Sequence, residues 1–211
     1  MMKKNIFMIT SCIMMLSISS VAYSAPGPYM SVNVGVAILN DSDVTDSTEP
    51  GLTMDMESDS GLALGVAVGY AVAGNMRFEG EFAYQENDLD NVSFYGIGTD
   101  LTGDTASYAF LLNGYYDFKN TSAFTPFISG GVGMVQVEIN NMNFPGSDDP
   151  DVSDDDTVFA YQFGAGVAYA VNEQISIDVK YRYFGTSDPE FETTEVEYSS
   201  NNIYAGVRIA F

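Results

Sequence analysis

Large apolar residues and small residues alternate along much of the chain with a period of two. Between residues 61 and 72, leucine, valine and tyrosine occupy one parity, while alanine and glycine occupy the other. The same alternation recurs from Met30 to Ile38 and from Ile203 to Phe211. Because successive side chains of a β-strand point to opposite faces, this period predicts strands and excludes amphipathic helices.

Eight segments show this alternation, and an even number of strands is typical of a closed bacterial outer-membrane barrel. The predicted strands cover residues 29–39, 61–72, 76–86, 104–118, 124–138, 157–171, 175–186 and 199–211. The connections alternate between short turns, at 73–75, 119–123 and 172–174, and long loops, at 40–60, 87–103, 139–156 and 187–198. Short periplasmic turns and long outer loops are typical of such barrels, so we predict an all-β fold, an eight-stranded antiparallel up-and-down transmembrane β-barrel.

The first residues have the pattern of a secretory signal peptide. Lys3 and Lys4 precede an apolar run that ends in small residues, and the run is short for a retained membrane anchor, which is the alternative. We therefore predict that residues 1–24 are removed and that residues 25–211 form the barrel domain. The only cysteine, Cys12, lies within the signal, so the exported chain would have neither a thiol nor a disulfide.

The charged residues of the strands decide which face is enclosed, because a soluble eight-stranded barrel would alternate in the same way. Four cations and four anions share the parity of the small residues. An eight-stranded lumen has little room, which places the small side chains inside, and charges enclosed with them must pair to offset their lost hydration. We predict a lumen salt-bridge network formed by Arg77, Glu79, Glu81, Asp117, Asp178, Lys180, Arg182 and Arg208.

The opposite, apolar face is then expected to contact lipid. Closure of the barrel satisfies the backbone hydrogen bonds that lipid cannot satisfy. Aromatic residues near the strand ends could form the two interfacial girdles, although ordinary strand propensity explains any one of them equally well. The candidates are Tyr29, Tyr70, Tyr84, Tyr108, Tyr116, Phe118, Tyr169 and Phe184.

The strings FLLNGYYDFK and TPFISGGVGM, together with the terminal NNIYAGVRIAF, resemble the OmpA-type, opacity-like outer membrane β-barrel family of Gram-negative bacteria. This family includes many small chains described as porin family. The resemblance covers essentially the whole exported chain, and it implies a location in the cell outer membrane. It also implies contacts with outer-membrane lipid and lipopolysaccharide, and with periplasmic chaperones and the barrel-assembly machinery. In the family the machinery recognises a final aromatic residue, and Phe211 occupies that place as the assembly signal.

Catalysis is the next class of function to weigh. The chain contains no histidine, and the outer-membrane proteases and lipases rely on one as a general base. Glu79 and Glu81 could be read as an acid and base pair, but the matched charges favour a salt-bridge network. The run from Gly130 to Gly133 lies inside a predicted strand, so it is not a phosphate-binding loop. We expect no enzymatic activity, no catalytic residue and no cofactor.

The long loops are strongly acidic. The formal charge of −22 for the whole chain becomes −24 when Lys3 and Lys4 leave with the signal, and the four long loops contain no lysine or arginine. Such a surface repels nucleic acid and attracts divalent cations or basic partners, although acidic loops are often simply solvated. The best candidates for weak divalent-cation binding are Asp148, Asp149, Asp151, Asp154, Asp155 and Asp156.

Two classes of function remain at this stage. The first is a structural or surface-interaction barrel that supports envelope integrity and adheres to partners through its acidic loops. The second is a narrow porin-like channel for small solutes or ions. A narrow lumen filled with charged side chains is expected to conduct poorly, which favours the first class and a monomeric protein.

Overall fold

The computed structural model describes the chain from residue 26 onwards, with gaps in the connections. The described residues are 26–40, 42–46, 53–58, 60–72, 74–94, 97–100, 102–143, 152–187, 190–191, 194–196 and 198–211. The predicted signal peptide therefore lies outside the described residues, and its removal stays a prediction. Nowhere in these ranges does the chain form a helix that is long and apolar enough to cross a membrane.

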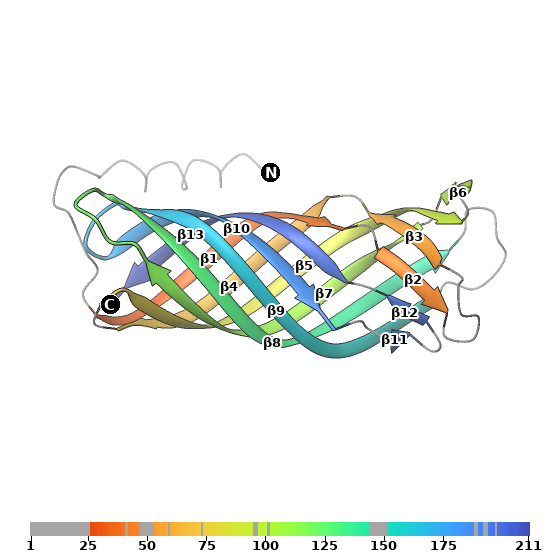
Figure 1. The fold of residues 1–211 in the computed structure, drawn as a ribbon, viewed down its shortest axis with the longest axis horizontal. Coiled ribbons are helices and arrows are strands. Elements are labelled where there is room, and N and C mark those ends of the chain that lie inside the picture. The colour runs from red at the N-terminus through yellow and green to blue at the C-terminus, as the bar shows by residue number, and fades with distance from the viewer. Residues whose placement is uncertain are drawn as a thin grey trace, which may run out of the picture.

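Eight antiparallel strands close into a barrel within the described residues (Figure 1). They are β1 (Gly27–Leu39), β4 (Gly61–Ala71), β5 (Met76–Phe94), β7 (Thr102–Asp117), β8 (Phe124–Asn143), β9 (Val152–Ala170), β10 (Ile175–Thr186) and β13 (Ser199–Ala210). Each strand pairs with the next one in this order, and β1 pairs with β13 to close the ring. The predicted fold class is confirmed.

The long connections contain more regular structure than the sequence pattern predicted. Five short strands lie at the end of the barrel away from the C-terminus (Figure 1): β2 (Ser42–Asp46), β3 (Thr53–Ser58), β6 (Ile97–Asp100), β11 (Glu190–Phe191) and β12 (Thr194–Val196). They pair in the order β11, β12, β2, β3, β5, and β6 pairs with the other side of β5. Backbone pairing needs no apolar alternation, so strands can extend beyond the membrane where the pattern ends.

The two faces of the strands differ as the alternation predicted. Along β1 the side chains alternate between buried and exposed positions, and the exposed ones include Met30, Val32 and Val34. The same holds for β4, where Val66 and Val68 are exposed. A continuous exposed apolar surface of this kind is unsuited to water and suited to lipid.

The prediction of interfacial girdle residues is wrong for two of the eight candidates. Tyr29 and Phe184 are buried inside the barrel. Each has the parity of the inward residues of its own strand, which include Ser31 for Tyr29 and Arg182 for Phe184. The other six have the outward parity, and ring contacts join Tyr84 to Tyr108, Tyr116 to Phe118 and Tyr169 to Phe124.

The outer part of the lumen is filled by large apolar side chains, where the sequence led us to expect small ones. Leu111, Val135, Val137, Phe184 and Tyr198 form one buried cluster there. Alanines of neighbouring strands belong to the same cluster, so small residues make the room that the large ones fill. The lumen is therefore packed as a core at this level.

Candidate functional site: the lumen and the outer rim

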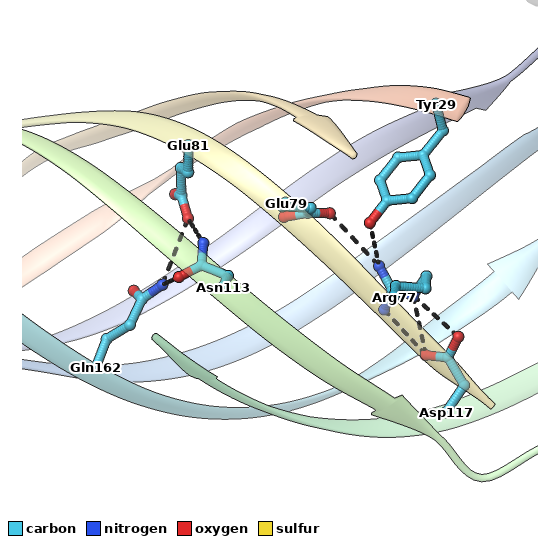
Figure 2. A network of polar contacts seen from close by, with 7 residues as sticks. All are labelled: Tyr29, Arg77, Glu79, Glu81, Asn113, Asp117 and Gln162. Carbon is cyan, nitrogen blue, oxygen red and sulfur yellow. Dashed lines mark hydrogen bonds and ion pairs between the residues drawn. The ribbon is translucent and has the colours of Figure 1, made fainter. Parts of the chain in front are cut away.

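Arg77 is the centre of a polar cluster near the short-turn end of the lumen (Figure 2). Its guanidinium donates two hydrogen bonds of 2.9 Å to the Asp117 carboxylate, one from Nε and one from Nη2. Nη1 lies 3.5 Å from Glu79 Oε1 and 3.5 Å from the Tyr29 hydroxyl. The same guanidinium lies 4.3 Å from the centre of the Tyr115 ring, a distance at which a cation is attracted to the ring face.

The sequence positions this cluster through strand parity and through one glycine. Arg77 and Glu79 are two residues apart on β5, so both point inward, and Arg77 pairs in register with Tyr115 of β7. Gly69 of β4 lies beside the Tyr29 ring, where an added Cβ would come within 2.4 Å of a ring atom. A larger residue at Gly69 would therefore displace the tyrosine from the cluster.

A second polar cluster surrounds Glu81. Arg182 donates a 2.9 Å hydrogen bond from Nη1 to Glu81 Oε1, and Asn113 donates one of 2.6 Å to Glu81 Oε2. Gln162 reaches both Glu81 and Asn113 (Figure 2). Arg182 also donates to the hydroxyl of Tyr204, whose ring centre lies 4.5 Å from the guanidinium. Both oxygens of this buried carboxylate thus have donors.

Three members of the Glu81 cluster were not predicted from the sequence: Asn113, Gln162 and Tyr204. All three have inward parity, which was a usable signal, and all three are buried. Gly131 of β8 makes room for Asn113, since a Cβ there would come within 1.9 Å of Asn113 Oδ1. Gly131 therefore permits close packing in the lumen.

The other three predicted network residues lie inside without a close ion pair. Asp178 and Lys180 are buried and Arg208 is partly buried, yet in the described part of the chain none has an oppositely charged side-chain atom within 4.0 Å. The Lys180 ammonium lies 5.2 Å from the Tyr204 ring centre, and the Arg208 guanidinium lies 5.6 Å from that of Tyr29. The structure thus groups five of the eight predicted residues into two separate clusters.

Two small cavities lie between these side chains in the region described. One of about 60 Å³ opens at the short-turn end beside Tyr29, Arg77 and Arg208, and one of about 10 Å³ adjoins Glu79 and Lys180. Glu79 and Glu81 belong to different clusters, and each faces an arginine. They do not form an acid and base pair around a shared cavity.

The proposed cation site falls largely outside the described residues. Asp148, Asp149 and Asp151 are not described, while Asp154, Asp155 and Asp156 follow one another on β9. Asp155 accepts a 3.0 Å hydrogen bond from Gln136. Among the described residues no three histidine, cysteine, aspartate or glutamate side chains are grouped to hold a metal ion, and the divalent-cation site stays a prediction.

The final aromatic residue is exposed at the short-turn end of the barrel. The backbone N–H of Phe211 donates a 3.0 Å hydrogen bond to the carbonyl oxygen of Pro28, which ties the last residue to the start of β1. Its role as an assembly signal stays a prediction.

A closed barrel with an apolar outer face and a packed polar lumen defines the class of small transmembrane β-barrels. The model of the family "Outer membrane protein beta-barrel domain" matches residues 8–211, and the chain belongs to this family. Its place in the outer membrane of a Gram-negative cell follows from this membership and from its relatives.

Two curated relatives are similar in sequence. Outer membrane protein PagN of Salmonella typhimurium is 39% identical over 100 residues, which are 46% of this chain and 38% of PagN. The matched stretch is therefore well under half of that relative's length. The putative adhesin RC1281 of Rickettsia conorii is 24% identical over 204 residues, covering 85% of this chain and 80% of the relative.

Two solved structures share the fold. Neisserial surface protein A superposes with a TM-score of 0.58 at 21% identity, over 88% of this chain and 97% of that one. OprG from Pseudomonas aeruginosa superposes with a TM-score of 0.53 at 18% identity, over 92% of this chain and 100% of that one. At these identities the likeness concerns the fold alone.

Proposed function

We propose that this protein is a surface-interaction barrel whose acidic outer rim binds basic surfaces on partner molecules. The observation that carries the proposal is the strand-paired extension at the outer end. Its strands β2, β3 and β12 pair with one another and with β5, and they belong to connections that contain aspartate and glutamate but no lysine or arginine. A relative that spans most of the chain is described as a putative adhesin.

The physical basis is the summed charge of the rim. Many carboxylates without interspersed cations create a negative potential that attracts basic surfaces and raises their rate of association. Strand pairing holds the backbone of β2, β3 and β12 in a fixed arrangement, which lowers the entropy lost on binding. The packed lumen below supports the rim, and the barrel as a whole contributes to the integrity of the envelope.

A narrow channel is the other candidate, and the lumen geometry disfavours it. The two polar clusters and the apolar cluster of Leu111, Val135 and Phe184 occupy the interior, and the described cavities are small. Planar-bilayer recording of the refolded protein is expected to show no stable stepwise conductance. Reproducible conductance steps would favour the channel instead.

Binding of a lysine-rich peptide to the full barrel in lipid nanodiscs tests the proposed function. The variant replaces Asp43, Asp46, Asp55 and Glu57 by their amides, and Glu173→Gln at a short turn on the opposite end is the control. Four lost charges at a few tenths of a kcal/mol each predict about tenfold weaker binding, while the control leaves affinity unchanged. Equal affinity for all three proteins, or affinity independent of salt, would reject the proposal.

A further inference from the structure

One glycine on the lipid-facing surface has no side chain covering it. Gly80 of β5, Gly114 of β7 and Gly130 of β8 all lie on the outward side of neighbouring strands. The position of a Cβ at Gly114 is covered by Phe78 at 3.8 Å, and that at Gly130 by Phe163 at 3.7 Å. For Gly80 no atom lies within 4 Å of that position among the described residues.

Gly80 is the floor of an apolar groove of about 400 Å³ on the outer surface. It pairs in register with Val68 of β4 and with Leu112 of β7, so the groove runs across several strands. Leu112 and Phe110 are 72% and 68% exposed, and together they form one wall. The outward-facing side chains that line the groove are Met30, Val66, Val68, Phe82, Phe110 and Leu112; Ala67, Glu81 and Leu111 also border it, and their side chains have the inward parity.

The groove lies near the middle of the membrane-spanning surface. Gly80 is four residues from Met76 at the start of β5 and four from Tyr84, whose ring contacts Tyr108. At about 3.3 Å per residue along a tilted strand, each end is roughly 13 Å away along the strand. At that depth the bilayer offers only hydrocarbon, so the group that fills the groove is apolar.

Charge indicates the leaflet from which such a group comes. Among the described residues, one basic side chain lies outside the lumen. It is Lys119, in the connection after β7 at the short-turn end. The outer connections contain no lysine or arginine to bind the phosphates of lipopolysaccharide. The short-turn side has Lys119 against the single turn anion Glu173, whereas the outer connections have many anions and no cation. Phosphate headgroups are therefore favoured on the short-turn side, which is periplasmic in barrels of this kind.

We propose that the Gly80 groove binds one acyl chain of a phospholipid from the periplasmic leaflet. The chain lies against the backbone at Gly80, between the ridge of Phe110 and Leu112 on one side and Val66 and Val68 on the other. Contacts on three sides give this chain more dispersion energy than it has against the rest of the barrel, so it exchanges more slowly with bulk lipid.

Quenching of a tryptophan by brominated acyl chains tests the proposal, because the protein has no tryptophan of its own. Phe110→Trp reports on the groove, and Phe163→Trp is its matched control, since Phe163 is 63% exposed and packs over a covered glycine. Each full-length variant is refolded into nanodiscs with increasing mole fractions of phospholipid brominated on its acyl chains. We expect quenching at the groove to saturate at a several-fold lower mole fraction than quenching at the control.

Two further substitutions distinguish quenching by a chain bound in the groove from quenching by bulk lipid. Adding Gly80→Leu, whose side chain enters open space, is expected to make the Phe110→Trp curve match the control, whereas adding Gly130→Leu leaves it unchanged. Identical curves for the two reporters would overturn the proposal. If adding unlabelled lipopolysaccharide restores the fluorescence of Phe110→Trp, the groove binds lipopolysaccharide and the proposal is wrong. If the difference between the two reporters disappears when each nanodisc holds one copy of the protein, a second protein fills the groove and the proposal is again wrong.

Discussion

The two polar clusters of the lumen contain the same kinds of groups but differ in their access to water. In the cluster near the short turns, the paired side chains of Arg77 and Asp117 are 6% and 11% exposed and adjoin a cavity of about 60 Å³. In the other cluster, Arg182 and Glu81 are 3% and 1% exposed and adjoin neither described lumen cavity. The same kind of arginine–carboxylate pair is thus more exposed in one cluster than in the other.

This difference in access to water determines how much stability the barrel loses when one side chain of an ion pair is removed. A buried ion left without its partner must be dehydrated without compensation, while an ion beside a cavity can be hydrated by water that enters it. Glu81 would keep the amides of Asn113 and Gln162 as donors, but amides do not neutralise its charge. The Glu81 cluster is therefore the more sensitive of the two.

Arg182→Met is expected to have the largest effect. It leaves the Glu81 carboxylate uncompensated, which predicts a loss of about 3–5 kcal/mol in the free energy of unfolding. Urea titration of the refolded barrel in micelles, followed by the shift between folded and unfolded bands on a gel, measures it. Binding of the lysine-rich peptide by the folded fraction is expected to stay unchanged, because the outer rim is not altered.

A double variant gives the control for this prediction. Arg182→Met combined with Glu81→Leu removes both charges, and replacing a buried ion pair by apolar groups is often neutral or stabilising. We expect the double variant to regain most of the lost stability. A double variant as unstable as the single one would show that packing, and not charge pairing, explains the effect.

Arg77→Met is expected to cost less. Asp117 would lose its hydrogen bonds from the guanidinium and Glu79 its 3.5 Å contact. Asp117 lines the cavity at the short-turn end and Glu79 lines the smaller one beside it, so water can reach both carboxylates. A loss of about 2 kcal/mol is expected in the same urea titration. If Arg77→Met and Arg182→Met destabilise the barrel equally, water access does not distinguish the two clusters.

The sequence predicted which residues point into the lumen but not which of them meet. Strand parity is local, so it placed Arg77, Glu81 and Arg182 on the inner face correctly. The contact of Glu81 with Arg182 joins residues 101 positions apart and depends on how the strands are staggered around the ring. No local pattern states that stagger, which is why one network was predicted and two clusters are found.

The remaining differences also have identifiable physical causes. Tyr29 and Phe184 were assigned to the lipid interface because aromatic residues near strand ends are common there, although their parity pointed inward. The strands β2, β3 and β12 escaped prediction because strands that leave the membrane no longer need one apolar face. Parity was therefore the most reliable part of the sequence signal.

Arg208→Met is expected to have the smallest effect and so extends the comparison to a cation without a close ion pair. Its guanidinium is partly buried, lies 5.6 Å from the Tyr29 ring centre and borders the cavity at the short-turn end. Removing it leaves no carboxylate without a direct ion-pair partner. We therefore expect the free energy of unfolding to change by no more than about 0.5 kcal/mol in the urea titration. A loss as large as that for Arg182→Met would mean that the summed charge of the lumen, rather than individual pairing and access to water, determines the stability of the barrel.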